Sequence, residues 1–347
     1  MSAEAQVAGL SPRAVAALAV VYTAIYVVPI YLSPTSRPAP NLSRDSPTVI
    51  RSRVRAASFS CLVCTLATLL VVTGRGGATL AEALRLMGWW PVHLADVARV
   101  VLLVAVLFAG PLFEAGVVEG GWTSWIRADG LADALGSWTG YRNYVAGPVT
   151  EELIWRSLLV PPALLALPHS ALTTSTSTTT SPSTPSHATN NPTSTLTPTS
   201  LVLVLPLSFA LAHIHHFYEF SLTHPRTPLF AQLLRSLFQV LYTSLFGAFA
   251  TFAFLRCASL PAVVAAHAFC NWMGLPRLWG RVGAGSVVAV DGAGPDHAKG
   301  LRGWSEVRTD AGVAWSVAYY ALLVGGAVGF YVLLWPLTES ERALVRF

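Results

Sequence analysis

The sequence predicts an all-α fold, a polytopic membrane helix bundle of about eight transmembrane helices. Of the 347 residues, 53% are hydrophobic and only 11% are charged, whereas a soluble domain carries about a quarter charged residues. One water-soluble core of this length could not bury so much apolar surface. Apolar runs of about 20 residues, the length that crosses a bilayer as a helix, recur along the chain. The bilayer is therefore the expected solvent for most of the side chains.

Each expected span is an apolar run bounded by polar or basic residues. The first run begins early in the chain, but it is long enough to span and is interpreted as a helix rather than a cleavable signal peptide. Trp89 and Trp90 mark an interfacial stretch after the second span, because indole rings prefer the headgroup level. The expected spans are residues 14–33, 56–73, 97–118, 146–167, 201–218, 229–254, 258–276 and 313–336.

The chain divides into two helical parts around a segment of different composition. Residues 169–200 are almost entirely Ser, Thr, Pro, Asn and Ala, with no Asp, Glu, Lys or Arg. Such a segment buries too little apolar area to offset the entropy of ordering it, so it is predicted to be a disordered insertion. Residues 1–168 then hold the first four spans, and residues 201–347 hold the last four.

The net charge is +5, and Lys299 is the only lysine, so almost all of the positive charge is arginine. The arginines lie in loops and form no stripe with interleaved aromatic residues, which argues against nucleic-acid binding. Most of them fall in the loops after spans one, three, five and seven, and this excess predicts that those loops face the cytosol. The four cysteines lie within or beside apolar runs and suggest no disulfide framework.

Three groups of polar residues interrupt the apolar segments, where a charge costs about 2.5–3.5 kcal/mol on insertion scales. The first group is Glu151–Arg156, at the start of the fourth span. Glu152 and Arg156 are four residues apart and can pair, which leaves Glu151 without a local partner. A solvated helix start, with a carboxylate near the positive end of the helix dipole, would explain the same residues.

The second group is His213, His215 and His216 near the end of the fifth span, and the third is His267 with Asn271 in the seventh. The histidines could ligate a metal or bond to backbone carbonyls at the interface. His267 and Asn271 share one helix face and could simply join helices through hydrogen bonds. Each group alone therefore leaves a structural explanation open.

The predicted topology brings the three groups together. The fourth span starts at the cytosolic face, whereas the fifth and seventh spans run toward that face. Glu151, His213, His267 and Asn271 are therefore all expected in the cytosolic half of the membrane. Polar residues at one depth on three spans predict a single site.

The ordered motifs EExxxR, FxxxH and HxxxN resemble those of the type II CAAX prenyl endopeptidases and their bacterial relatives of the abortive-infection and bacteriocin-immunity group. The flanking residues are similar to the eukaryotic branch of that family, and the resemblance covers about residues 140–280. In this chain the motifs are Glu151–Arg156, Phe209–His213 and His267–Asn271, with flanks at 141–150, 213–216 and 267–274.

The resemblance implies an intramembrane endopeptidase that removes the C-terminal aaX tripeptide from farnesylated or geranylgeranylated CaaX proteins, such as Ras-type GTPases. It implies that Glu151 activates water as a general base and that His213 holds this water. It also implies that His267 and Asn271 donate hydrogen bonds to the oxyanion. The expected location is the endoplasmic reticulum membrane, with the site facing the cytosol and membrane lipid around it. No cofactor is implied.

The same resemblance makes Glu152 and Arg156 structural or substrate-positioning residues, and it implies no metal. Two alternatives stay open. One is a zinc-dependent membrane protease in which Glu151, His213 and His267 are the ligands. The other is a non-catalytic membrane scaffold or immunity-type protein on the same fold.

Overall fold

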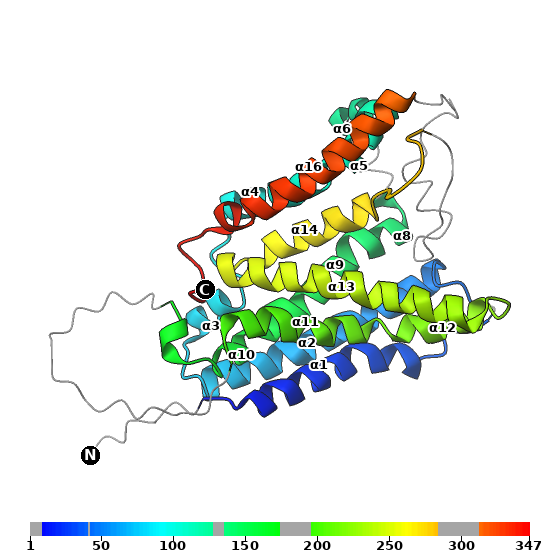
Figure 1. The fold of residues 1–347 in the computed structure, drawn as a ribbon. Helices are drawn as coiled ribbons and strands as arrows, with labels where there is room; N and C mark the ends of the chain where they lie inside the picture. The colour runs from blue at the N-terminus through cyan, green and yellow to red at the C-terminus, as the bar shows by residue number, and fades with distance from the viewer. Residues whose placement is uncertain (1–8, 41, 128–134, 174–195, 284–311) are drawn as a thin grey trace, which may run out of the picture.

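The computed structural model describes residues 9–40, 42–127, 135–173, 196–283 and 312–347. Within these ranges the regular elements are all helices, and the only strand-like pairings are two isolated bridges. The helices lie side by side in one bundle, with α16 (Val313–Thr338) and α4 (Leu94–Leu107) along one edge and α1 (Pro12–Leu32) along the opposite edge (Figure 1). The predicted all-α membrane bundle is therefore confirmed.

Proline and small polar caps start several of the long helices. Proline lies in the first turn of α1, α2 (Pro47–Gly74) and α11 (Pro198–Ala212), where its missing N–H has no helical partner to lose. The Ser11 side chain caps α1 by accepting a hydrogen bond from the Ala14 backbone. The chain of α11 continues through α12 (His215–Thr223), and α13 (Leu229–Cys257) follows.

Helices occur at all eight of the expected ranges, but not every one is a straight, long span. Among the described residues, five helices are long and apolar enough to cross a membrane, or six when a bent pair is counted as one. The bent pair joins α4 to α5 (Ala109–Phe113) and its continuation to Val118, with an 81° bend. Pro111 lies just after the bend, where it can donate no hydrogen bond to the preceding turn.

The two remaining expected spans differ from a continuous transmembrane helix. The seventh is the shorter α14 (Leu260–Met273). The fourth is a chain of short helical segments over residues 138–164, here called the site helix. The site helix is the most buried part of the bundle, because Ile154, Leu158 and Ala163 have no exposed surface. The other helices therefore enclose the segment that carries Glu151.

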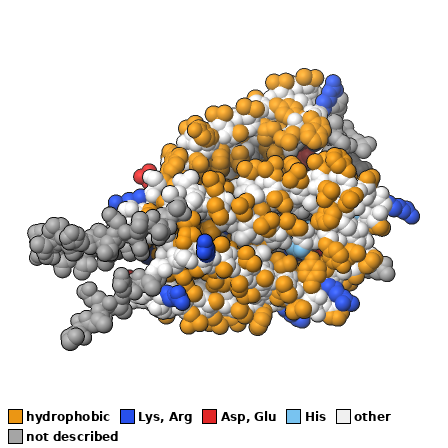
Figure 2. All heavy atoms as spheres, turned by 60° about the horizontal axis from the view of Figure 1, so that its bottom comes forward, with side chains coloured by type: hydrophobic (Ala, Val, Ile, Leu, Met, Phe, Trp, Pro, Cys, Tyr) orange, Lys and Arg blue, Asp and Glu red, His pale blue; other side chains and the backbone are white. Residues whose placement is uncertain are grey.

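The outer surface of the bundle is apolar. Figure 2 shows one face on which hydrophobic side chains cover most of the area, while Arg side chains lie mainly toward its two ends. Large side chains such as Leu32, Phe230 and Tyr331 are more than three-quarters exposed. A soluble protein rarely exposes so large a contiguous apolar surface. The molecule is therefore built for a lipid environment, as a multi-pass membrane protein.

The segment after α16 folds back across one end of the bundle. The Leu344 N–H donates to the Leu255 carbonyl at 2.8 Å, and Val345 forms an isolated bridge with Leu172. Leu344 and Val345 are both buried in the core. The segment therefore joins the end of α13 to the chain that leaves the site helix.

The expected insertion at 169–200 falls largely on residues 174–195, which lie outside the described residues. Its two ends are ordered. A short 3₁₀ turn covers His169–Ala171, and Thr197 caps α11 in a reciprocal pair of hydrogen bonds with Ser200. Residues 169–173 and 196–200 thus belong to the folded bundle.

Candidate active site

The site helix changes its winding on both sides of Glu151. Its segments are α8 (Trp138–Tyr141), α9 (Gly147–Glu152) and α10 (Val160–Leu164), separated by π-helical segments at Arg142–Ala146 and Leu153–Leu158. Such π segments occur often at functional sites. A side chain at Gly147 would lie 2.9 Å from the Arg142 carbonyl oxygen, so glycine allows the first π turn to close.

The two adjacent carboxylates point into different surroundings. Neighbouring residues on a helix project about 100° apart. The Glu152 side chain is fully buried, whereas the Glu151 side chain is 21% exposed. Glu151 Oε2 lies 3.9 Å from His213 Nε2 and 3.9 Å from His267 Nε2. These distances are too long for direct hydrogen bonds but suit a water molecule shared between the groups.

His213 lies at the C-terminal end of α11 and is held by its own helix. Its Nδ1–H donates to the Phe209 carbonyl oxygen at 2.8 Å. This leaves Nε2, on the side toward Glu151, as a hydrogen-bond acceptor in the neutral ring. The Phe209 ring meets the His213 ring edge-on, with 4.7 Å between centroids. Phe209 therefore fixes the orientation of His213 through both its backbone and its ring.

His267 is oriented from the other side, by the buried Glu152. Its Nδ1–H donates to Glu152 Oε1 at 2.7 Å, and Phe246 packs against the ring with 4.6 Å between centroids. The Nε2 atom then faces Glu151, as an acceptor in the neutral ring and as a donor in the imidazolium. A carboxylate at Nδ1 of a histidine fixes the tautomer and orientation of the ring.

Asn271 lies one turn beyond His267 on α14, at the exposed edge of the site. Its side-chain amide donates to the Asn143 carbonyl oxygen at 2.8 Å. This is the hydrogen bond that the structure shows for its side chain, and it does not join Asn271 to Glu151 or His213. An amide carries two N–H groups, so a second donor is left for a ligand. The structure thus brings Glu151, His213 and His267 together and places Asn271 beside them.

Glu152 and Arg156 form a completely buried ion pair, 3.1 Å apart, as their spacing predicts. The Arg156 guanidinium also lies over the Phe209 ring, 4.5 Å from its centroid. The close approach of α13 needs Gly247, because a Cβ there would lie 2.7 Å from the Pro206 side chain and 3.2 Å from Arg156 Nη2. The buried ion pair therefore supports both histidines: Glu152 bonds His267, and Arg156 lies over the Phe209 ring that packs on His213.

Comparison with known proteins agrees with this geometry. The model of the type II CAAX prenyl endopeptidase Rce1-like family matches residues 133–273, which include all of the side chains described above. A probable CAAX prenyl protease 2 of Schizosaccharomyces pombe is 32% identical over 321 residues, which are 92% of this chain and 92% of that protein. The chain belongs to the type II CAAX prenyl endopeptidase family.

Other relatives extend the similarity beyond the motifs. CAAX prenyl protease 2 of Homo sapiens is 30% identical over 251 residues, which are 68% of this chain and 65% of the human protein. CAAX prenyl protease 2 of Saccharomyces cerevisiae is 28% identical over 280 residues, which are 75% of this chain and 79% of the yeast protein. No solved structure matches the chain significantly. Membership of this family makes the chain a membrane endopeptidase.

Sequence reasoning missed several residues that shape the candidate site. Phe246, on α13, packs on His267, and Asn143 accepts from Asn271. Tyr26, on α1, bonds Thr150 at 2.9 Å beside Glu151. An aromatic residue in an apolar span and an asparagine carbonyl in a helix carry no recognisable signal in one sequence. The contacts could be found only from the folded chain.

The described residues include no group of three His, Cys, Asp or Glu side chains arranged to hold a metal ion. Glu151, His213 and His267 come nearest in type to such a set. The 3.9 Å separations between their polar atoms exceed the spacing of about 3.3 Å between two ligand atoms that each lie about 2 Å from a tetrahedral zinc. The metal dependence of the endopeptidase is tested by measuring cleavage after dialysis against a chelator.

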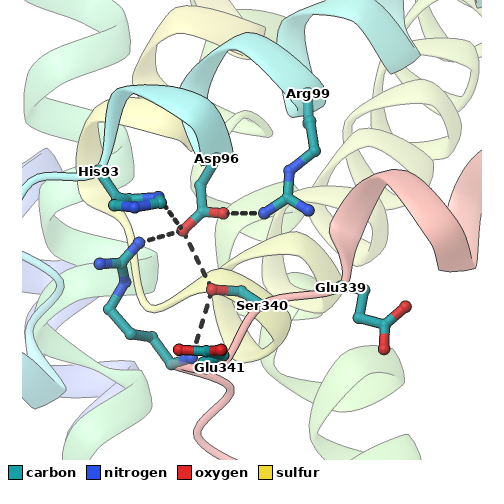
Figure 3. Close-up of a pocket in the computed structure, with 7 residues that line it drawn as sticks. His93, Asp96, Arg99, Glu339, Ser340 and Glu341 are labelled. Carbon is teal, nitrogen blue, oxygen red and sulfur yellow. Dashed lines mark hydrogen bonds and ion pairs between the residues drawn. The ribbon is translucent and has the colours of Figure 1, made fainter.

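A second cavity, of about 560 Å³, lies between α4 and the segment after α16. Its centre is the buried Asp96, which Figure 3 shows facing His93, Arg99 and Ser340. Asp96 forms ion pairs with Arg99 and Arg342 and accepts a hydrogen bond from Ser340. None of the predicted site residues lines this cavity. The ion pairs instead fasten the segment after α16 to the start of α4.

Proposed function

We propose that this chain removes the aaX tripeptide from farnesylated or geranylgeranylated CaaX proteins, using water activated by a glutamate. The observation that carries the proposal is the position of Glu151, whose Oε2 lies 3.9 Å from the Nε2 atoms of both His213 and His267. One water can bridge these three groups. A hydrolytic site needs such a positioned water within reach of a base.

The proposed reaction assigns one task to each side chain. Glu151 takes a proton from the water while His213 Nε2 accepts the other water hydrogen. The resulting hydroxide attacks the carbonyl carbon between the prenylcysteine and the first of the three released residues. His267, as the imidazolium, and Asn271 donate to the oxyanion. When the C–N bond breaks, the proton held by Glu151 passes to the leaving amine.

Glu152 and Arg156 support this reaction without touching the substrate. Glu152 accepts the 2.7 Å hydrogen bond from His267 Nδ1–H and so orients Nε2 toward the oxyanion. Arg156 balances the buried carboxylate and fixes Phe209 beneath its guanidinium. Both residues are therefore positioning residues in the proposal.

The substrate class follows from the names of the relatives and from lipid chemistry. The fission-yeast and human relatives are named as CAAX prenyl proteases. A prenyl chain enters lipid with about 0.8 kcal/mol per CH₂, so an enzyme embedded in the bilayer can receive the chain and the peptide together. We place the enzyme in the endoplasmic reticulum membrane, with the site toward the cytosol, and Ras-type GTPases among its substrates.

A cleavage assay tests this function. The purified protein in lipid vesicles is incubated with a farnesylated CaaX peptide, and release of the aaX tripeptide is measured by mass spectrometry. Wild type should cleave, and Glu151→Gln should not, because the amide has the same shape but cannot take a proton. The matched control is Glu341→Gln, at an exposed residue that lines the second cavity, and it should retain activity. Glu151→Gln activity above about a tenth of wild type would overturn the general-base role.

A further inference from the structure

Three arginines gather beside the active site, where α2, α12 and the site helix meet. Arg142 Nη1 lies 2.7 Å from Asp45 Oδ1 and donates to the Arg44 carbonyl oxygen at 3.1 Å. Arg53 Nη2 lies 2.6 Å from Glu219 Oε1. Three guanidinium groups thus face two carboxylates, and this arginine cluster carries one positive charge in excess.

The excess charge belongs to Arg44. Its guanidinium has no carboxylate partner within the described part of the chain. Two guanidinium nitrogens in the cluster, Arg44 Nε and Arg142 Nη2, are buried with no hydrogen-bond acceptor among the described residues. Leaving such donors unpaired is costly. The Arg44 side chain is only partly buried, so an anion bound beside it would balance the excess charge.

The arginine cluster is connected to the catalytic side chains by a short path. Asn271 donates to the Asn143 carbonyl oxygen at 2.8 Å, and Arg142 Nε donates to Asn143 Oδ1 at 2.9 Å. Arg142 therefore immediately precedes Asn143, the residue to which Asn271 donates. The cluster thus adjoins the Asn271 edge of the proposed site.

Arg142 lies close enough to Glu151 for its side chain to meet the end of a short peptide bound there. Arg142 precedes Glu151 by nine residues, which is at most about 13.5 Å at the α-helical rise of 1.5 Å per residue, and the π-helical segment Arg142–Ala146 shortens this distance. Three extended residues span about 10 Å. If the scissile carbonyl lies at Glu151, a guanidinium near Arg142 can reach the carboxylate of the third residue beyond it.

We propose that Arg44 and Arg142 bind the free C-terminal carboxylate of the substrate and so set the cut three residues before its end. The inference rests on the proposed function, because it assumes that a CaaX peptide is cleaved at Glu151. It adds that the enzyme recognises the chain end itself. Arg53 and Glu219 pair with each other at one side of this subsite, and neither contacts the carboxylate of the substrate.

The test pairs two substrates with two enzymes. A farnesylated CaaX peptide with a free carboxylate is compared with the same peptide ending in an amide, on wild type and on Arg44→Gln. Wild type should cleave the carboxylate peptide about 30- to 100-fold more efficiently in kcat/KM. Arg44→Gln should lower kcat/KM for the carboxylate peptide by a similar factor, mostly through KM, and should leave the amide peptide unchanged. Arg44→Lys should restore part of the loss.

The matched control is Arg37→Gln, because Arg37 is an exposed arginine in the same connection between α1 and α2. It should cleave both peptides as wild type does. Equal cleavage of the two peptides by wild type would overturn the inference and leave the proposed function standing. An equal loss on both peptides in Arg44→Gln, removed when anionic lipid is omitted, would assign the arginine cluster to lipid headgroups instead. Failure of wild type to cleave either peptide would count against the proposed function.

Discussion

His267 and Arg156 share one oxygen of the buried Glu152. The His267 Nδ1–H lies 2.7 Å from Glu152 Oε1, and Arg156 Nη1 lies 3.1 Å from the same atom. The other carboxylate oxygen has no hydrogen-bond partner among the residues that the structure describes. One oxygen thus connects α14 to the site helix and orients the imidazole that faces Glu151. The stability of the bundle and the geometry of the site depend on the same contact.

The first prediction concerns this buried pair. Arg156→Met should destabilise the protein by about 3–5 kcal/mol, because it leaves the Glu152 carboxylate without its cation in a buried place. The double variant Glu152→Gln/Arg156→Met should be more stable than the single variant, since it removes the stranded charge as well. Thermal unfolding in detergent, followed by fluorescence, measures both. A double variant less stable than Arg156→Met would mean that the Glu152 bond to His267 contributes more stability than the stranded charge costs.

The second prediction concerns the two proposed oxyanion donors. Asn271→Ala should lower kcat by roughly 10²–10³ with little change in KM, because a donor aimed at the oxyanion acts on the transition state. His267→Ala should do the same, and the double variant should lose less than the product of the two single losses. Since Asn271 already bonds the Asn143 carbonyl, a purely structural role would appear instead as weaker binding of a non-cleavable prenylated peptide with kcat unchanged.

The third prediction concerns metal dependence. Strong chelators should leave peptide cleavage largely intact, since the proposed mechanism uses Glu151 and two histidines without a metal. The measurement is cleavage after dialysis against a chelator, compared with a mock-dialysed sample. Loss of activity that zinc restores would instead support the zinc-protease alternative, in which the 3.9 Å separations contract around the ion.

The fourth prediction concerns the Ser/Thr-rich segment. Deleting residues 176–194 should preserve both folding and cleavage, because this Ser/Thr-rich composition is predicted not to pack and the free energy of closing a loop changes only slowly with its length. Deleting residues 172–198 should lower the unfolding temperature, since it removes the Leu172 bridge to Val345 and the Thr197 cap of α11. Cleavage and thermal unfolding of the two deletions give the comparison. Lost activity in a correctly folded 176–194 deletion would show that this segment acts in catalysis.

Hydropathy was sufficient for the positions of the helices but not for their shapes. Each apolar run became a helix because the bilayer leaves no other partner for backbone groups. The bend after α4 and the π segments around Glu151 arise from tertiary packing and from prolines whose effect depends on neighbouring helices. Composition likewise indicated the Ser/Thr-rich segment but missed its ordered ends, which are fixed by contacts with distant residues such as Val345.

The residues of the candidate site could be predicted from the sequence better than the contacts that hold them in place. Glu151, His213 and His267 stand out because ionisable residues are rare in apolar spans, and the Glu152–Arg156 pair follows from helical spacing. The bond from His267 to Glu152 could not be predicted, since it joins residues 115 positions apart. The sequence assigned the arginines of the cluster to membrane topology, and Arg142 also to a flank that resembles the family. Only the fold shows that Arg142 bonds Asn143, the partner of Asn271.

The segment after α16 has a consequence for how the chain is assembled during synthesis. Residues 339–347 leave the ribosome after every helix of the bundle, yet Leu344 completes a hydrogen bond with Leu255 and Arg342 pairs with the buried Asp96. Until then, Asp96 lacks one of its two arginine partners and the end of α13 is uncovered. These contacts with α4 and α13 can form only once residues 339–347 have been synthesised. A reporter fused directly after Phe347, which packs on Phe252 and Trp335, would disturb this late step more than one fused ahead of α1.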